Sequence, residues 1–80
     1  MAHWFTSTGG CTQAQAAKLD AIARSLGMGD GAGISLFAKA HGCSTEKARH
    51  RMSIKRADYS IAWAREQLTA LRHRRSLRPL

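Results

Sequence analysis

Apolar residues recur at helical spacing in two long segments of this 80-residue chain. The first stripe consists of Leu19, Ile22, Ala23 and Leu26, and the second of Ile61, Ala64, Leu68 and Leu71. Such stripes are typical of α-helices that bury one face. Aromatic residues make up 6% of the chain, so we expect a core built mainly from Ala, Leu, Ile and Met. These residues favour helices, and the sequence predicts an all-α domain, a compact bundle of four helices with no sheet.

Capping residues and glycines predict where the helices begin and end. Thr12 and Gln15 form a Thr-x-x-Gln capping box, so we expect the first helix to begin at Thr12 and to stop at Gly27. Alternate glycines from Gly27 to Gly33 predict a flexible connector, with Met28 as its anchored side chain. A nucleotide-binding loop is disfavoured, because no strand precedes this stretch and no Gly-Lys-Ser/Thr follows it. We expect two further helices over 33–40 and 45–55, followed by a last helix, the longest, that ends near residue 71.

Two side-chain pairings are expected on these helices. Asp20 and Arg24 are four residues apart, so we expect them to support each other on the solvent face of the first helix. Tyr59 and Trp63 are expected to widen the buried face of the last helix.

The length of the chain predicts one domain with a segment at each end. Residues 1–11 are interpreted as an N-terminal arm, 12–71 as the helical domain and 72–80 as a basic C-terminal tail that frays without a partner. The arm carries Trp4 and Phe5. These aromatic side chains are expected to fold back on the helical core, or alternatively to stack on bases or on a second subunit.

Positive charge is concentrated behind residue 38. The net charge is +8, yet the charges in residues 1–38 cancel. Residues 39–56 hold six Lys or Arg against Glu46, and residues 65–80 hold five Arg against Glu66. A basic surface concentrated in one half of a small protein is typical of polyanion binding, and nucleic acid is the most common polyanion.

One segment inside this basic half has the pattern of a DNA-binding motif. The run Phe37-Ala38-Lys39-Ala40-His41-Gly42-Cys43-Ser44-Thr45-Glu46-Lys47-Ala48-Arg49-His50-Arg51-Met52 resembles the helix-turn-helix of small bacterial, phage and plasmid DNA-binding proteins. The positions that carry the resemblance are Ala38, Gly42, Cys43, Ser44, Ala48 and Met52. A bulky side chain at 38 would force the two helices apart, and a β-carbon at 42 would strain the turn.

The resemblance implies sequence-selective binding of double-stranded DNA, in transcription regulation or in an accessory role in a DNA-processing complex. The helix over 45–55 would lie in the major groove. The candidate base-contacting residues are Ser44, Thr45, Glu46, Arg49, His50 and Ser53. Arg49 can bind guanine O6 and N7 together, and Glu46 can accept from a cytosine amine. The candidate phosphate-contacting residues are Lys39, Lys47, Arg51, Lys55, Arg56, Arg72, Arg74 and Arg75.

Other interpretations of the same residues stay open. Glu46, Arg49 and His50 can instead form a solvated network within one helix. The tail can enter the minor groove, follow phosphates, bind RNA or only add solubility. A small phage- or plasmid-type protein that inhibits or redirects a host protein or nucleoprotein complex is the main functional alternative. Small repressors usually dimerise, so a homodimer is one expected assembly.

Several classes of function are disfavoured. No positioned nucleophile and base or pair of carboxylates indicates an enzyme. His41, Cys43 and His50 do not have the spacing of a tetrahedral zinc site, and we expect neither metal nor cofactor. Cys11 and Cys43 are expected to be reduced thiols. No apolar run approaches the roughly 20 residues of a membrane span and no secretory signal is evident. A cytoplasmic, nucleoid-associated protein that does not bind membranes is therefore expected.

Overall fold

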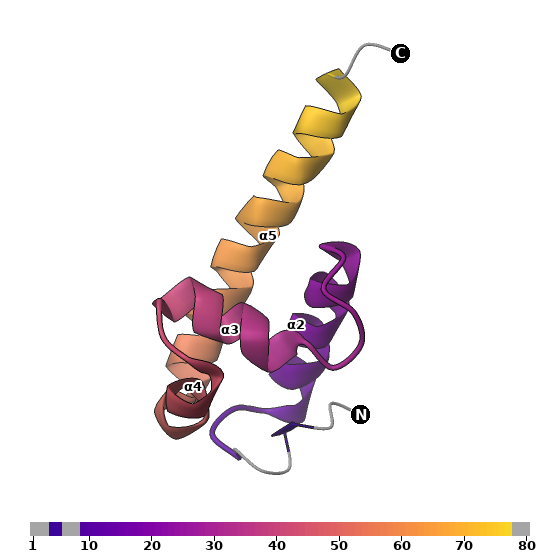
Figure 1. Cartoon of the computed structure of the whole chain (residues 1–80). Helices are drawn as coiled ribbons and strands as arrows, with labels where there is room; N and C mark the ends of the chain where they lie inside the picture. The colour runs from indigo at the N-terminus through magenta and orange to yellow at the C-terminus, as the bar shows by residue number, and fades with distance from the viewer. Residues whose placement is uncertain (1–3, 6–8, 78–80) are drawn as a thin grey trace.

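The computed structural model describes residues 4–5 and 9–77, with side chains placed as far as Arg75. Its helices are α2 (Gln13–Ser25), α3 (Gly33–His41), α4 (Thr45–Arg51) and α5 (Ile54–Leu77). α5 packs against both α2 and α3, and α4 packs against α3. Figure 1 shows α5 as a long rod whose C-terminal half extends past the other helices. The predicted all-α fold is confirmed, because the described part of the chain contains these four helices and no strand.

The predicted capping box at the start of α2 is confirmed, and it has a second role. Thr12 Oγ1 accepts from the Gln15 backbone N–H at 3.1 Å, and Gln15 Oε1 accepts from the Thr12 N–H at 2.9 Å. The Gln15 amide is buried and donates to the Ile54 carbonyl at 2.9 Å and to Asp58 Oδ1 at 2.7 Å. One side chain therefore caps α2 and ties it to the first turn of α5.

The expected pairing of Asp20 with Arg24 is wrong. Asp20 Oδ1 accepts from Trp4 Nε1 at 2.7 Å and from the Gly33 backbone N–H at 2.8 Å. Arg24 instead forms an ion pair with Asp30 at 2.9 Å, between side chains that are 70% and 86% exposed, so the pair contributes little to stability. Ala32, the N-cap of α3, has no side-chain cap bond. Asp20 supplies the missing acceptor from another helix.

The aromatic residues of the N-terminal segment fold back on the core, as expected. Trp4 is 5% exposed and Phe5 is half-buried against the same core. Stacking of Trp4 on bases is excluded in this arrangement because its ring is covered. Met28 packs on the core from the glycine-rich loop, as predicted. The other residues of the predicted arm, 1–3 and 6–8, lie outside the described residues.

The prediction of one continuous helix over 45–55 is wrong, because this segment is divided between α4 and α5. α4 ends at Arg51, and Met52 leaves helical geometry with φ −59° and ψ 131° while its side chain is buried. Ser53 then caps α5: its Oγ accepts from the Arg56 N–H at 3.1 Å and its carbonyl from the Ala57 N–H at 2.8 Å. This break was not predicted, because Met52 was interpreted as an apolar anchor inside one continuous helix.

The predicted end of the last helix near residue 71 is also wrong. α5 continues to Leu77, because residues 72–77 are good or neutral helix formers and include neither Gly nor Pro. The basic segment 72–77 is thus helical, and residues 78–80 lie outside the described residues. Ile61 and Ala64 are buried and Trp63 is half-buried, but Tyr59 is 57% exposed, so its predicted burial is wrong.

Among the described residues, no helix has both the length and the apolar character needed to cross a bilayer.

Candidate nucleic-acid interface

The turn between α3 and α4 is built around Gly42, which has a left-handed backbone with φ 63°. The Cys43 N–H donates to the Ala38 carbonyl at 3.0 Å, and the Gly42 N–H to the Lys39 carbonyl at 3.3 Å, which is the Schellman pattern of a helix C-terminus. Ser44 then caps α4, its Oγ accepting from the Lys47 N–H at 3.2 Å. These bonds set the direction in which α4 leaves α3.

α4 is anchored by one side chain and exposes the rest. Ala48 is fully buried and is the only buried residue among the seven of this helix. The exposed residues of α4 are Thr45, Glu46, Lys47, Arg49, His50 and Arg51. Five of the six predicted base-contacting residues, Ser44, Thr45, Glu46, Arg49 and His50, are therefore on the surface of α4 or its cap.

The sixth predicted base contact, Ser53, is placed elsewhere. It is half-buried and its hydroxyl caps α5, so it is not part of the helix that was expected to present it. The alternative network of Glu46 with Arg49 and His50 is also not formed, since no hydrogen bond or ion pair joins Glu46 to either side chain in the described structure.

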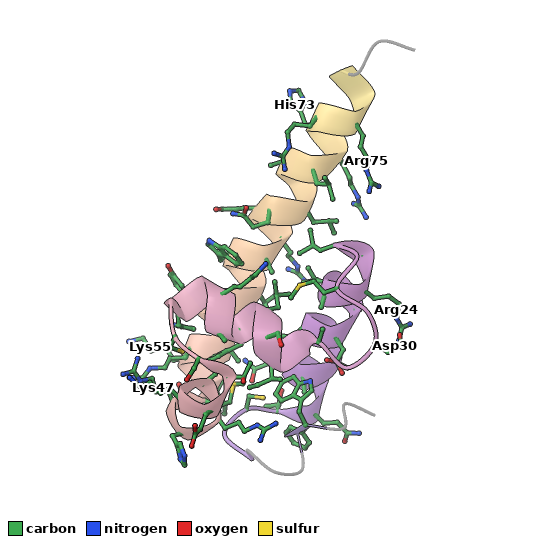
Figure 2. The ribbon with its side chains drawn as sticks, in the orientation of Figure 1. Arg24, Asp30, Lys47, Lys55, His73 and Arg75 are labelled. Carbon is green, nitrogen blue, oxygen red and sulfur yellow. The ribbon has the colours of Figure 1, made fainter. Side chains whose placement is uncertain are left out.

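The start of α5 extends the exposed surface of α4 into what we call the basic face. Its cations are Lys47, Arg49, Arg51, Lys55 and Arg56, all exposed. Arg56 Nη1 donates to the Arg51 carbonyl at 2.9 Å and so joins the end of α4 to the start of α5. Figure 2 shows Lys47 and Lys55 at the same end of the molecule. None of these five cations forms an ion pair with a described residue, and Glu46 is the only acid on α4.

A shallow hollow of about 570 Å³ adjoins the basic face, and its lining residues are Ala40, His41, Lys55, Arg56 and Tyr59. The His41 ring lies between Phe37 and Tyr59, with ring centroids 4.4 and 5.1 Å away. His41 Nε2 is 3.2 Å from the Arg56 carbonyl, which can only accept, so this nitrogen carries the proton. An exposed aromatic ring beside two cations is the arrangement on which bases stack. Tyr59 was not among the predicted site residues, although its position four residues after Lys55 puts both on one face of a helix.

The other predicted phosphate contacts lie away from the basic face. Arg72, Arg74 and Arg75 are exposed on the C-terminal half of α5, about 20 residues and roughly 30 Å beyond Lys55 along the helix axis. The molecule is 44 Å long, and Figure 2 places Lys55 and Arg75 toward its opposite ends. Lys39 on α3 borders the same groove as Arg74. The predicted phosphate set thus divides into two groups.

Within the residues that the structure describes, no group of three His, Cys, Asp or Glu side chains is positioned to hold a metal ion. Cys11 and Cys43 are free thiols, and burial raises the pKa of Cys11, which keeps this thiol protonated.

A scan of protein-family models and searches of curated proteins and of solved structures found no match to this chain.

Proposed function

We propose that this protein binds double-stranded DNA through the basic face, with α4 in the major groove. The observation that carries this proposal is the position of α4, which is held by the buried Ala48 and turns all its other side chains outward. Five exposed cations on α4 and the start of α5, none in an ion pair with a residue that the structure describes, give this surface its positive charge. An α-helix with its side chains is about 10–12 Å across, which suits a major groove about 12 Å wide.

The proposal gives each group of residues a role. Arg49 reads guanine and Glu46 accepts from a cytosine amine, with Thr45 and His50 near the base edges. Lys47, Arg51, Lys55 and Arg56 contact phosphates and hold the protein in position without reading sequence. Such binding is not enzymatic and suits transcription regulation, or an accessory role in a DNA-processing complex.

Salt dependence is the first test of the proposal. If the four phosphate-contacting cations of the basic face neutralise about four phosphates, log K should fall with log salt at a slope of about −3.6. Affinity for a labelled duplex should then drop roughly 150-fold between about 50 and 200 mM salt, measured by fluorescence anisotropy. Absence of measurable duplex binding at about 50 mM salt would contradict the proposal.

Two variants of α4 separate base reading from phosphate binding. Arg49→Ala should cost about 1–3 kcal/mol on the preferred sequence and relax the preference at that position, whereas Lys47→Ala should weaken all duplexes alike and lower the salt slope by about 1. Both side chains are exposed, so neither change should alter folding, and circular dichroism serves as the control. If both variants lose the same affinity on every sequence, Arg49 does not read bases and the protein binds DNA only non-specifically.

Selection from a random duplex library supplies the preferred sequence that this comparison needs. A selected site with two half-sites related by two-fold symmetry would also indicate that two copies bind together. A preference for structured RNA that disappears when residues 72–80 are deleted would instead favour RNA binding by the end of α5.

A further inference from the structure

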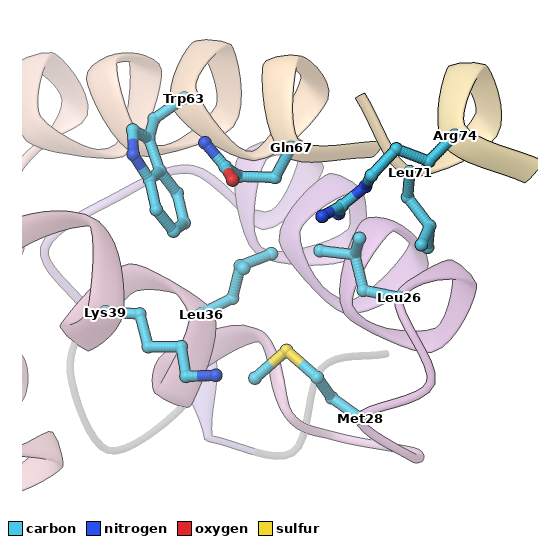
Figure 3. Close-up of a pocket in the computed structure, with 8 residues that line it drawn as sticks. All are labelled: Leu26, Met28, Leu36, Lys39, Trp63, Gln67, Leu71 and Arg74. Atoms are coloured by element: carbon cyan, nitrogen blue, oxygen red, sulfur yellow. The ribbon is translucent and has the colours of Figure 1, made fainter. Parts of the chain in front are cut away.

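An apolar groove, which we call the α3–α5 groove, lies between the end of α2, the glycine-rich loop, α3 and α5 (Figure 3). It encloses about 270 Å³. Its floor consists of Leu26, Met28, Leu36, Trp63 and Leu71. Leu36 is almost fully buried, and the other four side chains are half-buried, so the apolar floor remains accessible from outside.

Two cations border this floor from different helices. Lys39 on α3 and Arg74 on α5 both line the groove, although they are 35 positions apart in the sequence. Figure 3 shows the ammonium and the guanidinium groups directed toward the space above the floor. No acidic residue lines the groove, and neither cation forms an ion pair with any residue the structure describes. The groove therefore combines apolar surface with uncompensated positive charge.

We propose that the α3–α5 groove binds an acidic segment of a partner protein, with a large apolar side chain on the floor and carboxylates on Lys39 and Arg74. An arginine guanidinium binds a carboxylate through two parallel hydrogen bonds, and a buried apolar anchor surrounded by polar contacts is the usual centre of a protein interface. The thioether of Met28 adapts to the shape of the anchor. This inference does not depend on the proposed DNA binding, because the basic face lies on α4 and the start of α5.

The size and charge of the groove favour this occupant over others. A volume of about 270 Å³ is below the roughly 300–1,000 Å³ of pockets that enclose a small ligand. Along α5, the distance from Trp63 to Arg74 is about 16 Å, which is the length of about five extended residues. Nucleic acid is disfavoured because Trp63, the aromatic ring of the floor, is half-buried, whereas bases stack on exposed rings such as that of Tyr59. A second copy of this chain carries the same net charge of +8, which opposes its approach to a groove that is already positive.

Display of random 12-residue peptides against the full chain tests the proposal. We expect enrichment of sequences in which Leu, Phe, Trp or Met is flanked by Asp or Glu. A synthetic peptide of the enriched sequence should bind with an affinity that falls about ten-fold or more in Lys39→Glu and in Arg74→Glu, because each change places a carboxylate against the acidic partner. In nuclear magnetic resonance spectra, the peptide should shift the indole N–H of Trp63 and leave that of Trp4, which donates to Asp20, in place.

Control variants distinguish the groove from general attraction of acids to a basic protein. Arg75→Glu changes a neighbouring cation of α5 that does not line the groove, and Lys47→Glu changes one on the basic face. Both should keep peptide affinity within about two-fold, although Lys47→Glu should weaken DNA binding. Where a charge reversal disturbs folding, Lys39→Gln and Arg74→Gln replace it, with a smaller loss expected.

The proposal is overturned if no acidic–apolar sequence is enriched, if all four charge reversals weaken the peptide equally, or if the Trp63 indole signal does not move. Loss of DNA binding in Lys47→Glu with peptide binding intact would support peptide binding in the groove. The proposal is also supported if duplex DNA fails to bind, provided that the enriched peptide binds Lys47→Glu more tightly than Lys39→Glu.

Discussion

Replacing Asp20 with alanine is expected to lower the free energy of unfolding by about 3 kcal/mol, because one carboxylate oxygen serves two donors from distant parts of the chain. Asp20 Oδ1 accepts from the indole N–H of the buried Trp4 and from the Gly33 N–H at the start of α3. The substitution removes the acceptor of the indole N–H and of the Gly33 N–H, and it removes a negative charge from a helix N-terminus. For a domain of this size, whose total stability is about 4–12 kcal/mol, the melting temperature should drop by roughly 10–20 °C.

Thermal unfolding followed by circular dichroism measures this effect, and a double-mutant cycle assigns it. In a Trp4→Phe background the indole donor is absent, so Asp20→Ala should cost less than in the natural sequence, by about 1 kcal/mol or more. Asp20→Asn keeps an acceptor oxygen, so its free energy of unfolding should lie between those of the unchanged protein and of Asp20→Ala. A loss below about 0.5 kcal/mol for Asp20→Ala, or full additivity with Trp4→Phe, would show that the two bonds contribute little.

Gly10→Ala is expected to be the second severe change. Gly10 lies so close to the junction of α4 and α5 that a β-carbon would overlap the Met52 carbonyl oxygen and lie 2.7 Å from its carbon. Both partners belong to backbone, so relief requires a shift of the chain rather than of one side chain. We expect a loss of about 2–3 kcal/mol, typical of overpacking, measured as the midpoint of urea unfolding.

Gly42→Ala is the matched control for Gly10→Ala. No atom lies within 4 Å of a β-carbon built at Gly42, so only its left-handed backbone resists the change, at a cost of about 1 kcal/mol. Gly10→Ala should therefore be clearly worse than Gly42→Ala. The reverse order would mean that the N-terminal segment moves away from Met52 without loss of stability.

Local signals in the sequence predicted much of the fold. The Thr12–Gln15 capping box, the stripe that buries Leu19 and Ile22, and the glycine at the turn before Ser44 all depend on neighbours within a few residues. Such short-range geometry is the same in any helical protein. The exposure of Arg49 and His50 on α4 was predictable for the same reason, because burying Ala48 turns them outward.

The errors arose where a distant partner decides between two local options. Asp20 is four residues from Arg24, which is a suitable local partner, yet Trp4 and the Gly33 N–H are partners that only folding brings near. Met52 leaves helical geometry while its side chain stays buried in the core, and Ser53 then caps the next helix. Tyr59 remains exposed, while Ala57, Ile61 and Ala64 are the apolar residues of α5 that are buried in the core.

The helical class, the caps and the excess of positive charge in the second half of the chain were predictable, since each depends on residue type and local spacing. The division of that charge was not: one group lies around α4, whereas Lys39 and Arg74 lie over an apolar floor. Helix packing, rather than position along the chain, sets which side chains share a surface.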